Sequence, residues 1–208
     1  MKTKAFFKQP FFILSLIFIF AFFFRWYLMP GNLFFGPEQG RDMLVVRDIV
    51  DNHKFTLLGP RTETIGVFYG PAYYYLMSIP YLFTSDPVLL SLFLIFLNTL
   101  GVFFIYLLGK ELFGQRAGYI ASSLYAVSYW VVVSDRWFSH PPLSMLCGIL
   151  FVYLVVRFIK GEKKSLILSA IPFALAGQFQ IFSYPILGVV LLAAVFLFRS
   201  KFRKNLSP

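Results

Sequence analysis

Long apolar runs separated by short charged segments constrain the fold of this chain more than any other feature. A membrane-crossing helix needs about 20 predominantly apolar residues. With 59% hydrophobic and only 13% charged residues, the composition excludes an ordinary soluble domain. We predict an all-α, polytopic transmembrane helix bundle that forms a single domain over residues 1–208. The predicted spans are Pro10–Leu28, Pro87–Leu108, Ala117–Val133, Pro141–Phe158, Ser165–Gln180 and Phe182–Phe198.

The positions of Lys and Arg predict the orientation of the bundle. They form four clusters: Lys2, Lys4 and Lys8; Lys110 and Arg116; Arg157, Lys160, Lys163 and Lys164; and Arg199, Lys201, Arg203 and Lys204. All four fall on one side only if the further apolar stretch Gly66–Phe83 does not cross the membrane. We therefore predict that this stretch is a re-entrant or interfacial helix and that the clustered side is cytoplasmic.

This orientation predicts an integral protein of the plasma (inner) membrane with a cytoplasmic N-terminus. The first apolar run is interpreted as a retained signal anchor, because no small-residue cleavage site follows it. The net charge of +10 then reflects membrane topology, and we predict contact with membrane lipid and none with nucleic acid.

Two segments remain on the extracytoplasmic side, about Met29–Asp86 and residues 134–140. Within the first, a helix is predicted from Pro37 to about Asn52, because Pro is favoured in the first helical turn and the acid after it suits the helix dipole. Its apolar residues recur at helical spacing, so the helix is amphipathic and is expected to lie along the membrane surface. These residues are Val45, Val46, Ile49 and Val50.

Glu38, Arg41 and Asp42 share one face near the start of this predicted helix. In a functional interpretation Glu38 is a general base, and the second carboxylate of Asp42 together with partial desolvation tunes its proton affinity. In a structural interpretation Glu38 only compensates the helix dipole, and Arg41 and Asp42 form a solvated ion pair. The residues alone leave both interpretations open.

Arginines on the extracytoplasmic side are candidate ligands for the phosphate of a lipid, because a guanidinium binds phosphate oxygens in a bidentate manner. We select Arg41, Arg61 and Arg136, and add His140, which follows Arg136 at the start of a helix. The alternatives are contact with anionic headgroups, pairing with nearby carboxylates, and a helix-start role for the histidine. No residue spacing indicates a metal site, so no metal ligand is predicted. A requirement for a divalent ion is left open.

The order of these features resembles the N-terminal half of the GT-C class of membrane glycosyltransferases, in particular the protein O-mannosyltransferase and aminoarabinose-transferase type. Three segments carry the resemblance: Glu38–Gln39–Gly40–Arg41, Gly70–Pro71–Ala72–Tyr73–Tyr74–Tyr75, and residues 134–141, Ser-Asp-Arg-Trp-Phe-Ser-His-Pro. A further turn, Ala176–Gly177–Gln178–Phe179–Gln180, is similar to one between later helices of that class.

The resemblance implies that a sugar passes from a polyprenyl-phosphate donor to an acceptor at the outer membrane face, with Glu38 as base where the class usually has Asp. It places Gln39, Tyr73 and Tyr74 among the substrate-binding residues. The lipid-linked sugar is the only cosubstrate implied, and the acceptor can be a protein, a lipid or a glycan. Because members usually continue through further helices, the chain is expected to be the N-terminal part of such a module. The alternative is an inactive or truncated scaffold, or a transporter-like subunit that handles lipid-linked sugars.

Overall fold

The computed structural model describes residues 3–27 and 29–206, and every regular element within them is helical. Side chains at positions 3–10, 30 and 206 are outside the description, so Lys2, Lys4, Lys8 and Leu28 of the predictions are not placed in full. The helices are α1 (Thr3–Trp26), α2 (Met29–Asn32), α3 (Pro37–Asn52), α4 (Ala72–Tyr81), α5 (Pro87–Thr99), α6 (Gly101–Phe113), α7 (Gln115–Val127), α8 (Tyr129–Asp135), α9 (Pro141–Ile159), α10 (Lys164–Phe179), α11 (Ser183–Leu197) and α12 (Arg199–Leu206). The predicted all-α class is confirmed.

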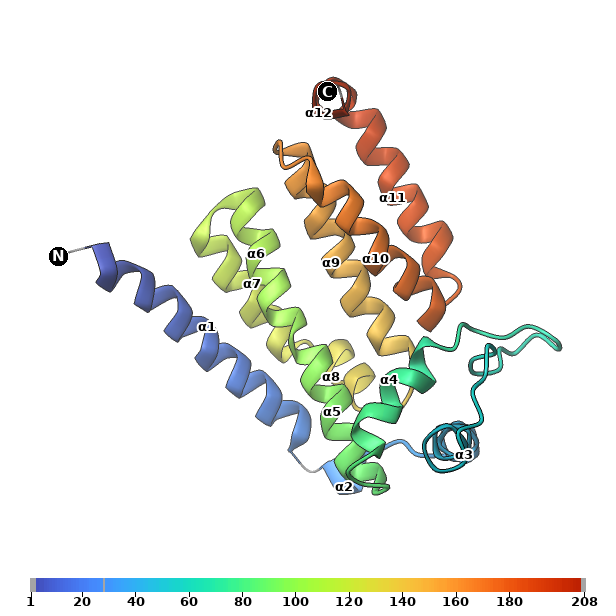
Figure 1. The fold of residues 1–208 in the computed structure, drawn as a ribbon. Helices are drawn as coiled ribbons and strands as arrows, with labels where there is room; N and C mark the ends of the chain where they lie inside the picture. Colours follow the sequence, from blue (N-terminus) through green and yellow to red (C-terminus); the bar gives the residue numbers. More distant parts are fainter. Residues whose placement is uncertain (1–2, 28, 207–208) are drawn as a thin grey trace.

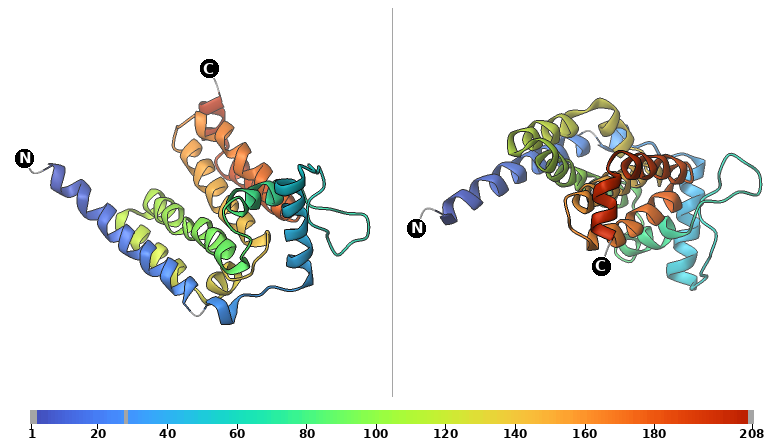
Figure 2. Two further views of the ribbon diagram at one scale, coloured as in Figure 1. Left: turned by 60° about the horizontal axis from the view of Figure 1, so that its bottom comes forward. Right: turned by 90° about the horizontal axis from the view of Figure 1, so that it is seen from above.

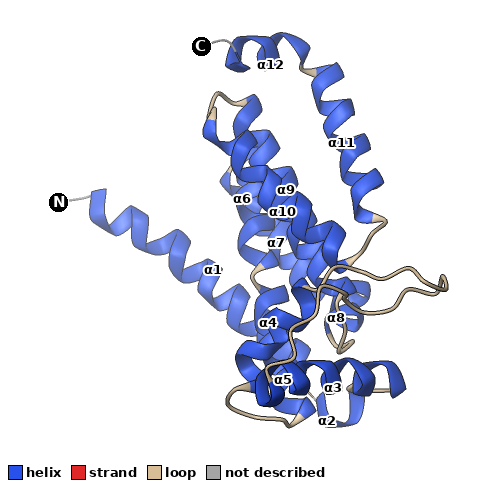
Figure 3. Cartoon of the chain, turned by 45° about the vertical axis from the view of Figure 1, so that its right-hand side comes forward, coloured by secondary structure: helices blue, strands red, loops and turns tan. Residues whose placement is uncertain are grey.

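The bundle has two chemically different ends (Figures 1 and 3). The α6–α7 and α9–α10 connections and α12 lie at one end, and they carry the three basic clusters that follow residue 100. At the opposite end lie α2, α3, α4 and α8. The start of α1 extends beyond the other helices (Figure 2). The basic clusters on these elements therefore share one end, as predicted, and the membrane side that this end faces stays a prediction.

The long helices agree in part with the predicted spans. Two helices are long and apolar enough to cross a membrane, Pro87–Phe113 (α5 with α6) and α9. The number rises to four if each of two bent pairs, α7 with α8 and α11 with α12, counts as one span. The apolar helices Phe11–Trp26 and Lys164–Phe179 are shorter.

The predicted span Ala117–Val133 is not one straight helix, because it is broken between α7 and α8. Ser128 has extended backbone angles (φ −60°, ψ 119°), and the axes of the two helices differ by 57°. The break turns α8 toward the end of the bundle that carries α3 and α4. Because α8 leads into residues 134–140, this bend decides where the second extracytoplasmic segment lies.

The ambiguous stretch Gly66–Phe83 does not contain a spanning helix. Its only helix is the ten-residue α4. At 1.5 Å per residue, ten residues cover about 15 Å, roughly half of a bilayer core. The length of α4 therefore agrees with a non-crossing helix, and its re-entrant or interfacial position stays a prediction.

The α3 helix begins at Pro37 and ends at Asn52, as predicted. Its apolar face packs on protein: Met43, Val46 and Ile49 are buried in a core that they share with α4, α5, α9 and α10. The same buried face also contains Gln39 and Asp42. This differs from the prediction of a helix resting on the membrane surface. Protein packing holds α3 in place, which fixes the polar residues at its start.

Candidate active site at one end of the bundle

Glu38 lies in the first turn of α3, with its side chain exposed. Gly36 caps the helix, and its backbone N–H donates to Gln39 Oε1 over 2.9 Å. A carboxylate in the first turn is favoured by the helix dipole. Glu38 is thus accessible to a substrate, and the dipole interpretation of the sequence is also satisfied. Gln39, a predicted substrate-binding residue, is buried with its side-chain oxygen used in the cap.

Asp42 lies one helical turn after Glu38 and is only 5% exposed. Its Oδ1 accepts hydrogen bonds from Arg41 Nη2 (3.0 Å), Arg41 Nε (3.2 Å) and the Tyr74 hydroxyl (3.0 Å). The ion pair of the structural interpretation therefore exists, but the idea that it is solvated is wrong for its carboxylate, which Tyr74 covers. Burial raises the pKa of Asp42, against the lowering effect of the Arg41 guanidinium.

Both predicted substrate-binding tyrosines lie on the buried face of α4. Tyr73 is 1% exposed and Tyr74 is 4% exposed. Burial and the nearby Asp42 carboxylate raise the pKa of both phenols, so they stay protonated at neutral pH. The Tyr74 hydroxyl donates a hydrogen bond to Asp42 Oδ1, and Tyr74 also lines a pocket. Tyr74 therefore reaches the site directly, whereas Tyr73 supports it from within the core.

A pocket of about 230 Å³ opens beside the Arg41–Asp42 pair. Two guanidinium-bearing residues, Arg41 and Arg61, line it together with Tyr74. The remaining lining residues are Val45, Thr56, Leu58, Gly59 and Phe68. Two arginines around one cavity favour an anion such as a phosphate. The structure thus brings together two of the four predicted phosphate ligands; we call this cavity the arginine pocket.

Arg61 belongs to a small hairpin, residues 59–69, that stands at the mouth of this site. Backbone hydrogen bonds close it: Gly59 N–H to the Tyr69 carbonyl (3.0 Å), Tyr69 N–H to the Pro60 carbonyl (2.9 Å) and Thr62 N–H to the Val67 carbonyl (3.1 Å). Arg61 and Phe68 form an antiparallel bridge. A hollow of about 420 Å³ is lined by hairpin residues 61–68 alone. These bonds fix the position of Arg61 in a segment without helical structure.

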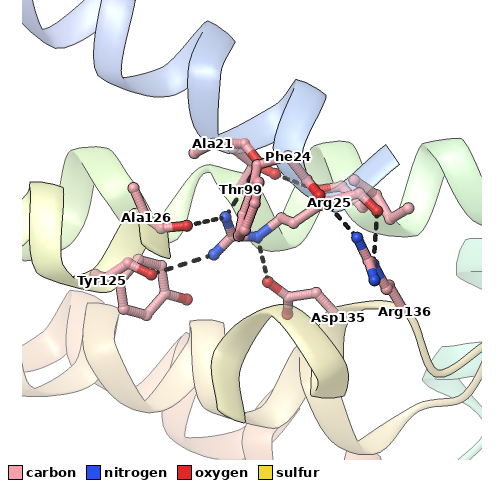
Figure 4. Close-up of polar contacts among 9 residues, drawn as sticks. Ala21, Phe24, Arg25, Thr99, Tyr125, Ala126, Asp135 and Arg136 are labelled. Atoms are coloured by element: carbon pink, nitrogen blue, oxygen red, sulfur yellow. Dashed lines mark hydrogen bonds and ion pairs between the residues drawn. The ribbon is translucent and has the colours of Figure 1, made fainter. Parts of the chain in front are cut away.

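Arg136 lies elsewhere, at the C-terminus of α1 (Figure 4). Its Nε donates to the Arg25 carbonyl over 3.0 Å, and its Nη2 donates to the carbonyls of Phe24 (2.9 Å) and Tyr27 (3.2 Å). A basic side chain commonly satisfies the last carbonyls of a helix in this way. The structure therefore uses Arg136 as a helix cap, and Arg136 is not part of the lining of the arginine pocket.

His140, the fourth predicted phosphate ligand, is buried in the core. Its Nδ1 donates to the Phe179 carbonyl, and its ring contacts those of Tyr69 and Tyr73 at centroid distances of 4.4 and 5.7 Å. Burial lowers the pKa of His140 to about 4, so the imidazole is neutral at pH 7. In this form His140 supplies no positive charge to a phosphate, and it joins α9 to the end of α10.

Two motifs that are distant in the sequence meet beside His140. Gly70 N–H donates to the Gln178 carbonyl over 3.1 Å, and Ala72 N–H donates to Gln178 Oε1 over 3.2 Å. A Cβ atom at position 70 would lie 2.6 Å from Gln178 Cγ, so the contact requires glycine. The segment before α4 is thus bonded to the C-terminus of α10.

Sequence reasoning missed an ion pair within the bundle. Arg25 Nε lies 2.6 Å from Asp135 Oδ2, and both side chains have no exposed surface (Figure 4). The Arg25 guanidinium also donates to the carbonyls of Ala21 (3.1 Å), Ala126 (2.9 Å) and Tyr125 (3.4 Å). The sequence signal for this pair was Arg25 at the end of the first apolar run, because a charged side chain within a membrane-spanning segment needs a partner. The partner lies 110 positions away.

Among the side chains that the structure describes, no three His, Cys, Asp or Glu residues are grouped so that they could hold one metal ion. The structure therefore assigns no metal ligand.

The fold and the site define an integral membrane protein with a polar, arginine-lined site at one end of an α-helical bundle. A family model, dolichyl-phosphate-mannose-protein mannosyltransferase, matches residues 69–207, and the chain belongs to this family. Membership identifies a membrane glycosyltransferase in general, with a lipid-linked sugar as the donor that the family implies. No curated protein and no solved structure matches the chain.

The family match confirms the class that the sequence resembles. It begins at the end of the hairpin, so Glu38, Arg41, Asp42 and Arg61 precede it. The family match therefore does not bear on these residues, and their roles stay predictions.

Proposed function

We propose that this chain transfers a sugar from a polyprenyl-phosphate donor to an acceptor hydroxyl or amine, with Glu38 as the general base. The arginine pocket carries the proposal, because two arginines line it and one of them, Arg41, is paired with Asp42, which lies one helical turn after Glu38. Such a pocket suits the phosphate of a lipid-linked donor. In this proposal the end of the bundle that carries α3 and α4 faces the extracytoplasmic side, and the end with the clusters of Lys and Arg faces the cytoplasm.

The chemistry requires one proton transfer and one displacement. Glu38 takes the proton of the acceptor, and the acceptor atom attacks the anomeric carbon of the sugar. The bond from that carbon to the phosphate oxygen breaks, and its electron pair leaves with the polyprenyl phosphate. Arg41 and Arg61 stabilise the charge that develops on the leaving phosphate. Asp42 positions Arg41 through their ion pair.

An apolar groove supports the placement of the lipid chain. It has a volume of about 440 Å³ and is formed by α4, α5, α9 and α10; its lining includes Tyr75, Leu97 and Leu146. The Tyr75 hydroxyl donates to the backbone carbonyl of Thr56 over 2.7 Å, and Thr56 lines the arginine pocket. Groove and pocket therefore adjoin, as a donor with a polar head and an apolar tail requires.

The test is sugar transfer from a labelled polyprenyl-phosphate sugar by membranes that contain the full chain. The Glu38→Gln variant keeps the size of the side chain but cannot accept a proton, so transfer should fall by about 10²–10⁴-fold. Glu38→Asp should retain more activity than Glu38→Gln. Asp51→Asn, at an exposed carboxylate near the other end of α3, is the matched control and should be fully active.

Membrane insertion and expression of each variant are measured in parallel. Full transfer by Glu38→Gln would remove Glu38 as the base. An inactive wild-type chain that inserts normally would support a scaffold or transporter-like role instead.

A further inference from the structure

A second polar pocket lies on the other face of hairpin 59–69. It has a volume of about 320 Å³, within the usual range of about 300–1,000 Å³ for small-molecule sites. The hairpin and the α10–α11 connection form it: Thr62, Glu63, Thr64, Val67, Tyr69, Gln180, Ile181 and Phe182. We propose that this pocket binds a neutral, hydroxyl-rich carbohydrate unit and serves as the acceptor subsite. The acceptor role rests on the proposed glycosyl transfer.

One residue of the pocket, Gln180, has an unpartnered polar atom. Gln180 Oε1 is buried and has no hydrogen-bond partner among the residues that the structure describes. A buried acceptor without a donor costs free energy, so such atoms usually have a partner that supplies an N–H or O–H. Gln180 lines the pocket. Oε1 itself has almost no accessible surface, so a ligand hydroxyl can supply the missing donor once the Gln180 side chain turns toward the pocket.

The charge of the pocket disfavours an anionic ligand. Among the described residues its lining contains no Lys, Arg or His, and its one ionisable carboxylate is Glu63. His140, which contacts the Tyr69 ring, is neutral because burial lowers its pKa to about 4. The arginine pocket, by contrast, has two cations. The two cavities therefore select different chemistry, a phosphate in one and a neutral group in the other.

The polar and apolar groups of the pocket match a sugar ring. Carboxylate, amide and hydroxyl groups exchange hydrogen bonds with sugar hydroxyls, while Tyr69 and Phe182 offer apolar surface to its C–H faces. Partial burial and the nearby Glu63 carboxylate raise the pKa of Tyr69, so its hydroxyl keeps its proton. The lining thus provides donors and acceptors together.

The hairpin connects the two pockets directly. Arg61 lines the arginine pocket, and the next two residues, Thr62 and Glu63, line the second one. Successive side chains of an extended segment, here Arg61 and Thr62, point to opposite faces, whereas Glu63 lies in the bend that follows. The hydrogen bonds from Gly70 and Ala72 to Gln178 hold the base of the hairpin against α10. A ligand in the arginine pocket and a ligand in the second pocket would therefore be separated only by the hairpin.

Two probes and two variants test the assignment in phosphatidylcholine nanodiscs that contain the full chain. Methyl α-mannoside is the neutral probe, followed by saturation-transfer NMR, and undecaprenyl phosphate is the anionic probe. Glu63→Gln and Gln180→Leu should weaken methyl α-mannoside binding by about five-fold or more, the effect of losing one net hydrogen bond. Both should leave undecaprenyl phosphate binding unchanged. Arg61→Gln, on the opposite face of the hairpin, should have the reverse effect.

Glu63 is exposed, so its substitution tests the pocket even if Gln180→Leu folds poorly. The assignment is overturned if the wild type does not bind the mannoside, if neither variant weakens its binding, or if Arg61→Gln weakens it equally. The proposed function has a separate outcome: if both probes bind as expected but no sugar is transferred, the acceptor role fails and the carbohydrate site stands.

Discussion

Two arginine–aspartate pairs occupy different regions of this molecule and contrast sharply. Arg25 and Asp135 meet inside the bundle with no exposed side-chain surface, and main-chain carbonyls surround the guanidinium. Arg41 and Asp42 meet at the edge of a pocket, where the Arg41 side chain is 37% exposed and that of Asp42 is 7% exposed. The Arg25–Asp135 pair joins α1 to α8. In the Arg41–Asp42 pair, by contrast, the arginine also lines the arginine pocket.

The contrast teaches that burial, and not the ion pair itself, separates a pair that only joins helices from a pair whose guanidinium can still meet a ligand. A fully buried guanidinium bonded to carbonyls has little freedom to meet a ligand. A half-exposed guanidinium whose carboxylate is covered by a tyrosine is oriented but still accessible. Removing one member of each pair should therefore have different consequences.

The largest effect is expected from Asp135→Leu. Because Arg25 would remain buried without its counter-charge, the variant should lose about 3–5 kcal/mol of stability. The double variant Arg25→Leu/Asp135→Leu should recover most of this loss, since no charge is left behind. Thermal unfolding in nanodiscs measures both, and Asp51→Leu, at an exposed position, should change stability by less than about 0.5 kcal/mol. A double variant as unstable as the single one would show that the pair does more than neutralise charge.

Asp42→Asn should have a smaller effect on stability, at most about 1–2 kcal/mol, since the amide still accepts hydrogen bonds from Arg41 and Tyr74 and burial already disfavours the charge that it removes. Tyr74→Phe removes the hydroxyl from the same carboxylate. A double-mutant cycle of the two substitutions should show coupling, because both groups contact Asp42 Oδ1. If Asp42→Asn were as costly as Asp135→Leu, the distinction between the two pairs would fail.

The pH dependence of stability should report the burial of Asp42. Its folded-state pKa lies above the ordinary value of 3.8, so the folded protein binds this proton more tightly than the unfolded chain. The stability contribution of Asp42 is therefore fully present below pH 3.8 and is lost as pH rises through the folded pKa. The melting temperature of the wild type relative to Asp42→Asn should fall over that interval. A relative rise would mean that the Arg41 charge outweighs burial.

Salt should have the smallest effect and should act on one pair only. Raising ionic strength from 0.05 to 0.5 M screens the half-exposed Arg41, so the stability difference between wild type and Asp42→Asn should shrink by a few tenths of a kcal/mol, within the range of about 0–1 kcal/mol for exposed pairs. The difference between wild type and Asp135→Leu should stay constant. Equal salt sensitivity in both pairs would place the Arg25–Asp135 pair in contact with solvent.

Local signals in the sequence predicted much of the framework. The proline, the acid and the apolar spacing of residues 37–52 were sufficient to predict α3 with its observed bounds. Hydropathy identified the apolar helices, and the distribution of basic residues led to a non-crossing Gly66–Phe83. Glu38, Arg41 and Arg61 were selected as site residues from charge and position alone, and the structure places the two arginines at one cavity.

The other site residues depended on contacts that local patterns do not contain. Arg136 and His140 look like ligands in the sequence because they are polar residues in a loop, yet one caps α1 and the other is buried against α10. The bend at Ser128 and the docking of α8 decide both positions.

The sequence by itself determined that the chain enters a membrane as helices and that an acidic, arginine-bearing segment follows the first of them, because hydropathy, helix dipoles and charge distribution are properties of neighbouring residues. Only the tertiary structure decided which charges are buried. Asp42 is covered by a tyrosine 32 positions away, and Arg25 is neutralised by an aspartate 110 positions away. Burial arises from the packing of distant helices, so the division between structural and functional charges appears only once the chain has folded.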